Sequence, residues 1–348
     1  MSSVATSTPA SRTQVYGLAF TAGVLHFLGW AGFGIWPLAL VCMVPLFAAL
    51  ELGSNRNWLH SLAVGWFYGA VSYAGGYHWL VEFLEVFSGY GLAASTVFFL
   101  LFCLYLGFDY ALYAVLYRAL RKRGWSRAAV AVPLLLLMEW GYPALFPTYL
   151  ANSFHMLTWP TQMADLGGPL LITALIGVVN LAIYETWRWW KERRAAPKLI
   201  WAVTAAAALF SMVYGVVRVA QIETRMADAP VLRLGIVQVN MGIFAKWDEA
   251  VEGHRRHLEQ SHQLEDAGEL DLIVWPESAY VSSLPRKLPL SVDRVRRGLT
   301  TPMLFGGVST ELVDGERKIY NTVFAADADG MVRSTYDKTY LLMFGEYL

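Results

Sequence analysis

Long apolar runs separated by short polar stretches fill the first two-thirds of the chain. A helix needs about 20 apolar residues to cross the hydrocarbon core of a bilayer. After a polar tail at 1–14, the pattern predicts a polytopic α-helical membrane domain over 15–220. We place about seven spans in it, near 15–32, 34–51, 58–80, 92–118, 128–146, 166–187 and 199–219.

The pattern changes after a linker that ends at Pro230. Residues 231–239 form a run rich in β-branched side chains, which predicts a buried strand. Helical spacing follows over 246–265, with Val251 and Leu258 on the apolar side and His254 and His257 on the solvated side. Strands at 270–275, 302–308, 319–326 and 331–336, with a helix at 288–299, complete an α/β layered pattern over 231–348.

Loop charges predict the orientation of the membrane domain. Lys and Arg gather between spans four and five (118–127) and between spans six and seven (188–198), whereas the loops near 32–34, 81–91 and 147–165 contain neither residue. Basic loops stay on the cytoplasmic side. We therefore expect a cytoplasmic N-terminus and, after an odd number of spans, a second domain on the outer face, the periplasm in a bacterium.

Composition narrows the function classes. Hydrophobic residues make up 56% of the chain and charged residues 16%, and the formal net charge is zero, which gives no reason to expect a nucleic acid partner. Both cysteines, Cys42 and Cys103, lie in apolar runs and are expected to be small buried side chains. The histidines show no spacing typical of metal ligands, so we predict no metal and no cofactor.

Two acidic residues inside the predicted spans are candidate sites, because a charged group in a bilayer is costly. Asp109 lies among tyrosines in span four, and a hydrogen-bonded structural role is the favoured interpretation, although its role stays open. Glu139 lies in span five and is followed by Trp140. For Glu139 a functional and a structural role are equally supported by the sequence.

Three ionisable side chains that could take part in acid–base chemistry lie in the last part of the chain. Glu277 follows the strand at 270–275, Lys338 follows the strand at 331–336, and Glu346 comes shortly after. Functional groups collect at the carboxyl ends of strands in layered α/β sheets. A carboxylate of this kind can move a proton, and an ammonium group can stabilise an oxyanion, so the set suits acyl transfer through an activated cysteine.

In this order, and after so many spans, these motifs resemble those of the apolipoprotein N-acyltransferases, the integral-membrane branch of the carbon–nitrogen hydrolase (nitrilase) family. The resemblance covers nearly the whole chain. It rests on the segments Gly235–Asn240, Lys246–Trp247, Trp275–Ser278, Tyr320–Asn321, Tyr336–Lys338 and Phe344–Tyr347, and on 65–69 and 78–80 in the membrane part.

The resemblance implies a reaction and roles for several residues. A phospholipid donates an acyl chain to a cysteine, and the thioester then acylates the α-amino group of a diacylglyceryl-modified apolipoprotein. Glu277 matches the general base, Lys338 the oxyanion-stabilising lysine, Glu346 a further essential acid and Trp247 a residue that contacts lipid substrate, while Glu139 is a candidate substrate-binding residue. The location implied is the bacterial inner membrane, with the hydrolase-like domain in the periplasm.

The sequence departs from this family at the nucleophile, since no cysteine follows Lys338. We therefore expect 231–348 to be a partial nitrilase-like sandwich that lacks its C-terminal half and a last span. We also expect the 348-residue chain alone to transfer no acyl group, and the reading frame to continue to a cysteine. The alternatives are a non-catalytic lipid-binding or scaffolding membrane protein, and another membrane-anchored acyltransferase or amidase of the same superfamily.

Overall fold

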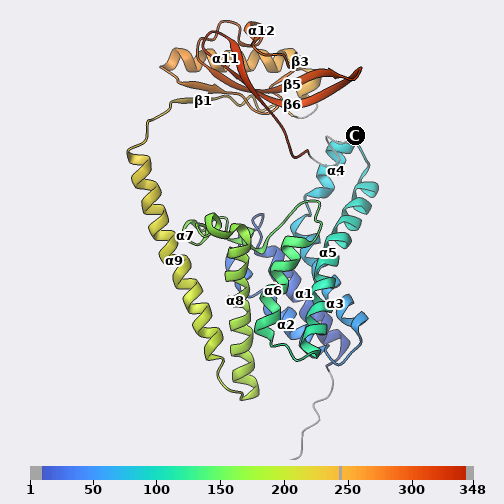
Figure 1. Cartoon of the computed structure of the whole chain (residues 1–348). Helices are drawn as coiled ribbons and strands as arrows, with labels where there is room; N and C mark the ends of the chain where they lie inside the picture. The colour runs from blue at the N-terminus through green and yellow to red at the C-terminus, as the bar shows by residue number, and fades with distance from the viewer. Residues whose placement is uncertain (1–9, 243–244, 342–348) are drawn as a thin grey trace, which may run out of the picture. The chain divides into compact units, whose positions relative to one another are not determined.

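The chain divides into two compact units, Met1–Ala227 and Asp228–Leu348 (Figure 1). The computed structural model describes residues 10–242 and 245–341, without the side chains of Lys246 and Trp247. The first unit is helical and the second contains a sheet. A helical membrane unit and a sheet unit are the two parts that the hydrophobic pattern predicts.

The first unit contains nine α-helices and two 3₁₀ helices among the described residues. Side chains of Ser11, Asn57 and Ser126 each accept a hydrogen bond from a backbone N–H in the first turn of α1, α3 and α6, which explains where these helices begin. The elements are α1 (Arg12–Leu28), η1 (Trp36–Leu40), α2 (Met43–Leu52), α3 (Trp58–Gly76), α4 (Leu80–Ser88), α5 (Leu92–Lys122), α6 (Arg127–Gly141), η2 (Leu150–Phe154), α7 (Thr158–Thr161), α8 (Ala164–Glu192) and α9 (Lys198–Ala227).

Helix length and hydropathy support a membrane location for this unit. Within the described residues, three helices are long and apolar enough to cross a bilayer, namely α5, α8 and α9, and 36–52 forms a shorter apolar helical stretch. All seven predicted segments contain helix. The number of spans and their orientation remain predictions, because several of the other helices are short.

The predicted span at 34–51 is not one continuous helix. It consists of η1 and α2, with a break between Leu40 and Met43. The buried side chain of Asn180 on α8 replaces backbone bonds at this break, since its Oδ1 accepts from Met43 N at 2.8 Å and its Nδ2 donates to Ala39 O at 2.8 Å. A buried amide thus satisfies the backbone groups that the interruption leaves unpaired.

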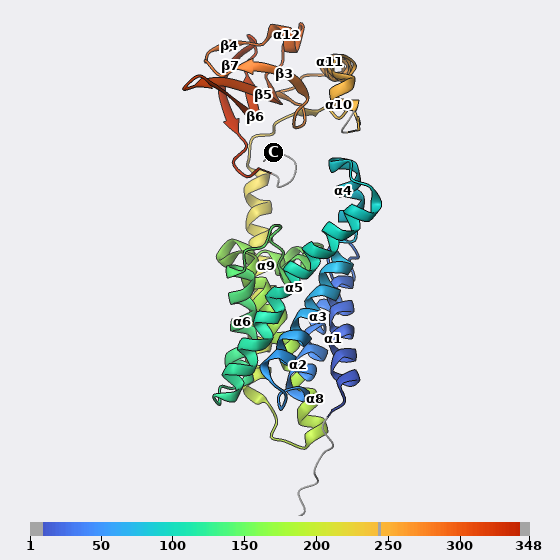
Figure 2. The same cartoon turned by 90° about the vertical axis from the view of Figure 1, so that its right-hand side faces the viewer.

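The helices α1, α3 and α5 lie side by side in both views (Figures 1 and 2). The close approach of α3 and α5 depends on glycines. A Cβ atom at Gly65 would lie 2.1 Å from Tyr110 O, and one at Gly69 would lie 2.7 Å from Gly107 O. Small residues four apart permit such contact between helix backbones in a bilayer, where packing replaces the hydrophobic effect.

The second unit contains a seven-stranded mixed sheet among the described residues, in the order β1-β2-β5-β6-β7-β4 with β3 paired to β5. The pairs β1–β2, β2–β5 and β3–β5 are parallel, and the remaining pairs are antiparallel. The elements are β1 (Leu234–Ile236), α10 (Ala245–Asp248), α11 (Ala250–Ala267), β2 (Leu272–Val274), β3 (Tyr280–Pro285), β4 (Leu290–Ser291), α12 (Asp293–Arg296), β5 (Met303–Val313), β6 (Glu316–Ala326) and β7 (Met331–Asp337).

The hairpin predicted around 327–330 is confirmed. Asp327 O accepts from Gly330 N at 3.0 Å, and Gly330 adopts a φ of 77°, which a glycine reaches without strain. Strands β5 and β6 are longer than predicted. They continue to a second tight turn at Asp314-Gly315, where both residues have positive φ.

Three predictions for this unit are wrong in detail. The helix predicted at 288–299 is reduced to the single turn α12, because Leu290 and Ser291 pair with β7 instead. The run 231–239 contains only a three-residue strand, and Ile236 is 73% exposed within the structure rather than buried. The buried face of α11 also differs, since Val251 is 86% exposed while His257 is buried with Leu258.

Candidate active site

Glu277 lies in a tight connection that leaves the end of β2 and passes over β5. The following residue, Ser278, has a φ of 52°, a left-handed conformation that non-glycine residues rarely adopt. Strand β5 can approach this connection only because it carries a glycine there. A Cβ at Gly306 would lie 2.6 Å from Pro276 O and 2.7 Å from the Cα of Glu277.

Lys338 follows the last residue of β7, and the register of the sheet brings it to Glu277. Strand β6 pairs with both β5 and β7, so Thr322 lies opposite Gly307 on one side and Asp337 on the other. The backbone N–H of Lys338 donates to Asn321 O at 2.8 Å, which fixes the direction of the chain after β7. Two residues 61 positions apart in the sequence therefore meet at one sheet edge.

The Glu277 carboxylate contacts an ammonium and an amide group. Its Oε1 atom lies 3.2 Å from Nζ of Lys338 and accepts a hydrogen bond from Nδ2 of Asn321 at 2.5 Å. The side chains are 60% exposed for Glu277 and 32% for Lys338. Of the predicted site residues, Glu277 and Lys338 are thus brought into direct contact.

Asp337 connects the site to the interior of the sheet. Its Oδ1 accepts from Thr322 Oγ1 at 2.7 Å, and its Oδ2 lies 2.8 Å from Nη2 of Arg286. The hydrogen bond from the Arg286 guanidinium holds the pKa of the Asp337 carboxyl below its usual value. The Arg286 guanidinium in turn lies 4.0 Å from the ring centroid of Tyr320. This arrangement holds the end of β7 in place immediately before Lys338.

Trp275 anchors the other side of the Glu277 connection. The indole is buried, and its Nε1–H donates to Ser261 Oγ on α11 at 2.8 Å. The ring centroid of His257 lies 4.9 Å from that of the indole, and the ring of Phe305 also packs against the indole. Because the indole is fixed by packing and by a hydrogen bond, the backbone that carries Glu277 starts from a rigid position.

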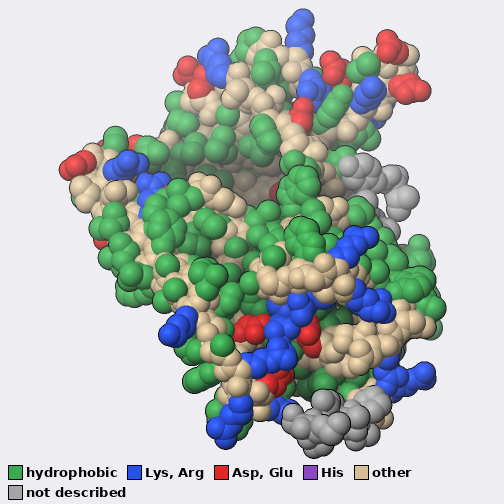
Figure 3. All heavy atoms as spheres, turned by 60° about the horizontal axis from the view of Figure 1, so that its bottom comes forward, with side chains coloured by type: hydrophobic (Ala, Val, Ile, Leu, Met, Phe, Trp, Pro, Cys, Tyr) green, Lys and Arg blue, Asp and Glu red, His purple; other side chains and the backbone are tan. Residues whose placement is uncertain are grey.

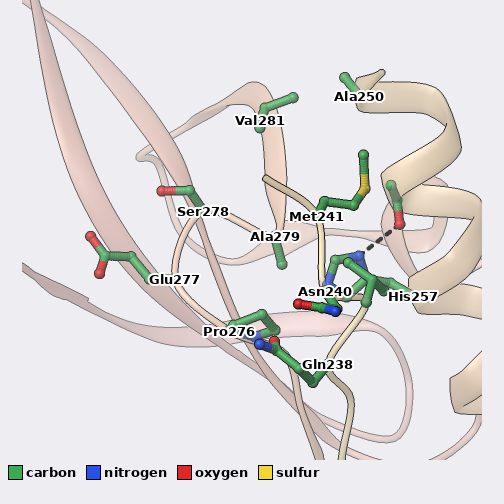
Figure 4. A pocket seen from close by; sticks show the side chains of 12 residues that line it. Gln238, Asn240, Met241, Ala250, His257, Pro276, Glu277, Ser278, Ala279 and Val281 are labelled. Carbon is green, nitrogen blue, oxygen red and sulfur yellow. Dashed lines mark hydrogen bonds between the residues drawn. The ribbon is translucent and has the colours of Figure 1, made fainter. Parts of the chain in front are cut away.

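A cavity of about 230 Å³ lies beside this connection, lined by 238–241, by residues of α11, by 276–279 and by Val281. Figure 4 shows the side chains of Asn240, Met241 and His257 on one side of it, while the Glu277 carboxylate points away from them. The cavity therefore borders the backbone of the Glu277 connection. The carboxylate itself faces the Lys338 side.

The remaining site predictions are placed as follows. Glu346 lies outside the described residues, and for Trp247 the structure describes the backbone, in α10, but not the side chain. Glu139 is partly buried on α6 and accepts from Leu150 N at 2.8 Å and from Thr173 Oγ1 at 2.7 Å, which links α6 to η2 and α8. Asp109 is buried within α5, and its Oδ1 has no hydrogen-bond partner among the described groups.

Both cysteines of the sequence, Cys42 and Cys103, are buried in the first unit, whereas Glu277 belongs to the second. Among the described residues, no three or more His, Cys, Asp or Glu side chains are grouped as a candidate metal site. The carboxylate of Glu277 and the ammonium group of Lys338 are of the types suited to proton transfer and oxyanion stabilisation.

Asn321 and Arg286 contribute to the site although the sequence analysis assigned neither a role. Asn321 belongs to one of the segments on which the family resemblance rests, but only the pairing of β6 with β7 shows that it lies beside Lys338. The hairpin turn at 327–330 does not by itself predict that register, because counting outward from it places 321 opposite 336, whereas a register shift between Ala325 and Ala326 brings Thr322 opposite Asp337. Arg286 follows β3, a strand that the sequence analysis did not predict, so no signal pointed to it.

Comparison with known proteins addresses the relationship directly. Residues 22–182 match the family model described as the apolipoprotein N-acyltransferase N-terminal domain. The apolipoprotein N-acyltransferase of Geobacter metallireducens is 29% identical over 346 residues, covering 96% of this chain and 64% of the relative. The chain is related to the apolipoprotein N-acyltransferases. The enzymes of that name from Azotobacter vinelandii (29% identity, 95% of this chain, 64% of the relative) and Pseudomonas putida (28%, 95% and 65%) agree.

The resemblance stated from the motifs is thereby confirmed. The chain spans about 64% of the length of the apolipoprotein N-acyltransferases from Geobacter and Azotobacter that it matches. The alignments include both units, because they cover at least 95% of the chain in these two cases. The family relationship and the apolar helices together fit a membrane protein of the acyltransferase class.

Proposed function

We propose that the protein takes part in N-acylation of bacterial lipoproteins, with a phospholipid as acyl donor and the N-terminal diacylglyceryl-cysteine of an apolipoprotein as acceptor. The names of its relatives support this class of reaction. In this proposal the first unit is a multi-pass domain of the inner membrane with a cytoplasmic N-terminus. The second unit is a nitrilase-like domain in the periplasm.

The reaction proceeds in two acyl transfers. Glu277 accepts the proton of a cysteine thiol as the sulfur attacks the ester carbonyl of the phospholipid, and the proton passes to the departing lyso-lipid alkoxide. The lipoprotein amine then attacks the thioester, loses its proton to the carboxylate and releases the thiol. Lys338 stabilises the oxyanion of each tetrahedral intermediate. Since Cys42 and Cys103 are buried in the first unit, the proposed nucleophile belongs to the part of the relatives that this chain does not span.

The observation that carries the proposal is the contact between Glu277 and Lys338. A carboxylate and an ammonium group lie 3.2 Å apart, one after β2 and the other after β7. Both can act on the same reacting carbonyl, since the carboxylate can transfer a proton and the ammonium group can stabilise the oxyanion. Glu346 remains the candidate further acid. Trp247 and Glu139 remain candidate contacts for lipid substrate.

Complementation of a strain depleted of its own lipoprotein N-acyltransferase tests the proposal. The reading frame that contains this chain is expressed in that strain, and the acylation of a marker lipoprotein is read by mass spectrometry. We expect the wild-type protein to restore the N-linked acyl chain. Glu277→Ala and Lys338→Ala should each reduce the rate at least 100-fold, as removal of a positioned acid–base or oxyanion group does.

Two matched substitutions separate loss of chemistry from loss of folding. Glu316→Ala and Lys287→Ala remove an exposed carboxylate and an exposed ammonium group of the same unit away from the Glu277–Lys338 contact, and they should leave acylation unchanged. Failure of the expressed wild-type protein to restore acylation would instead favour the non-catalytic lipid-binding or scaffolding alternative, and full acylation by the Glu277 and Lys338 variants would refute the roles proposed for these two residues. An active enzyme that modifies another amide or amine but no lipoprotein would favour a different acyltransferase or amidase of the superfamily.

A further inference from the structure

A second cavity lies in the first unit, at the end of the bundle where the basic loops gather. It has a volume of about 210 Å³ and lies between the end of α2 and the last turns of α5. Its polar lining consists of Ser54 and Asn55 from the loop after α2, Glu51, and the cationic side chains Arg118, Arg121 and Lys122. Figure 3 shows Lys and Arg side chains gathered at this end with a few acidic ones, against an otherwise largely hydrophobic surface.

Ion pairs hold the basic loops together at this end. Glu51 Oε1 lies 3.1 Å from Nε of Arg121, and its Oε2 lies 3.2 Å from Nη1 of Arg127, which also pairs with Glu185 on α8. Tyr117 Oη donates to the same Glu51 carboxylate at 2.8 Å. One carboxylate is thus satisfied by two guanidinium groups and a phenol, and its charge is neutralised within the network.

The other two cations of the cavity have no such partner. Within the residues that the structure describes, no carboxylate forms an ion pair with Arg118 or Lys122. The Nη2 atom of Arg118 donates to Arg56 O at 2.6 Å, but its buried Nε has no hydrogen-bond acceptor. Buried donors of this kind are nearly always satisfied in native proteins, so an acceptor is expected at this position.

We propose that this cavity binds an anionic phosphate group, the one carried by an acidic phospholipid headgroup. Besides Arg121, which pairs with Glu51, the lining supplies the cationic side chains of Arg118 and Lys122, together with a hydroxyl and an amide that can donate to phosphate oxygens. The apolar part of α5 stops at its last turn, which contains Arg121 and Lys122. The cavity beside this turn therefore lies at the depth of the lipid headgroups. Basic pockets between membrane helices are known to hold such headgroups.

The cavity is distinct from the Glu277–Lys338 contact, which belongs to the other unit. The proposal therefore goes beyond acyl transfer. It assigns to the first unit a resident lipid that bridges the end of α2 and the last turns of α5. An anion there would balance the charges of Arg118 and Lys122, which the ion-pair network around Glu51 leaves out.

Binding of short-chain lipids to the full chain in a neutral detergent tests the proposal. The probes are dihexanoyl phosphatidylglycerol, which is acidic, dihexanoyl phosphatidylcholine, which is zwitterionic, and inorganic phosphate, and bound ligand is counted by native mass spectrometry. We expect at least about tenfold tighter binding of the acidic lipid than of the zwitterionic one. The double variant Arg118→Gln, Lys122→Gln should lose about tenfold or more in affinity for the acidic lipid, since each surface cation contributes about a factor of five.

Arg123→Gln is the matched control, because it removes the same charge one residue after Lys122 but does not line the cavity. It should cost clearly less affinity than Lys122→Gln, which removes a charge that lines the cavity. An equal loss in Arg123→Gln, or no preference for the acidic lipid in the wild-type protein, would overturn the proposal. If the double variant does not fold, Lys122→Gln alone decides, because that side chain is exposed and its loss is expected to reduce affinity about threefold or more.

The phosphate arm identifies the source of the ligand. Inorganic phosphate that displaces the acidic lipid only at high millimolar concentration supports the lipid headgroup as the occupant. Tight phosphate binding that is lost in the double variant, with no lipid preference, would reassign the cavity to a soluble phosphate compound and refute the lipid assignment.

Discussion

The contact between Gly306 and the Glu277 connection leads to a sharp prediction about the second unit. Adding one methyl group in Gly306→Ala would place a Cβ 2.6 Å from Pro276 O, 2.7 Å from the Cα of Glu277 and 2.7 Å from Ser278 N. Contacting heavy atoms prefer separations of about 3.5–4.0 Å. The connection would therefore have to move by about 1 Å away from β5, and all three obstructing atoms belong to the backbone rather than to a flexible side chain.

Overpacking of this kind costs about 1–3 kcal/mol, and here the strain falls on the segment that positions Glu277. Hydrogen–deuterium exchange of the whole protein measures it locally, because amide exchange reports the opening free energy of each segment. Peptides covering 272–281 and 303–313 should exchange about 5- to 150-fold faster in Gly306→Ala, as 1.4 kcal/mol corresponds to a factor of ten. Peptides of the first unit should be unchanged.

Gly253→Ala provides a control of opposite sign. Its added methyl meets only Met241, at 3.0 Å from the flexible side-chain sulfur. Gly253 lies inside α11, where alanine is favoured over glycine by about 1 kcal/mol. This variant should therefore slow exchange in α11 or leave it unchanged. Unaltered exchange in Gly306→Ala, or an equal acceleration in Gly253→Ala, would refute the steric explanation.

Three other predictions concern side chains that hold a buried or charged group in place. Ser261→Ala leaves the buried indole N–H of Trp275 without its acceptor. Hydrogen exchange should then show a local opening free energy lower by about 1–3 kcal/mol, and in a Trp275→Phe background the same substitution should lower this free energy by less. The lowered pKa of Asp337 means that its pair with Arg286 stabilises the fold fully above about pH 4, the unfolded pKa, and less as the pH falls below it; Arg286→Ala should flatten the dependence of β7 exchange on pH below about pH 4. Asn180→Leu should lower the melting temperature in detergent, because it leaves two backbone groups at the η1–α2 break unpaired at about 1–3 kcal/mol each.

Helical segments of the first unit were predictable because each apolar run is long and ends at a polar or glycine-containing stretch. The η1–α2 break was not, since it depends on Asn180, which is 141 residues away from Ala39 in the chain. Hydropathy cannot register an amide that replaces backbone bonds from another helix. The same limitation applies to the ion-pair network around Glu51, whose members come from four helices.

In the second unit, five of the seven strands were predicted along the sequence, but β3, β4, the strand lengths and the buried face of α11 were not. His257 was placed on the solvated face because histidine is polar, yet the ring is buried against Trp275 and its Nδ1 is hydrogen-bonded to Gly253 O at 2.7 Å. An internal hydrogen bond of this kind helps to make the ring compatible with the core. Strand β3 lacks period-two alternation and became a strand only through its pairing with β5.

The functional interpretation of the Glu277–Lys338 contact gains support from its energetics. Exposed ion pairs contribute about 0–1 kcal/mol to stability, and Glu277 is 60% exposed. The left-handed backbone of Ser278 costs about 1–2 kcal/mol, so the ion pair does not offset the conformation that presents it. Left-handed backbone at a non-glycine residue is enriched at sites where geometry serves binding or catalysis. Ser278→Gly discriminates between the two interpretations: by relieving the strain it should stabilise the 272–281 segment by about 1 kcal/mol, and lower acylation despite that gain would show that the strained geometry serves the reaction.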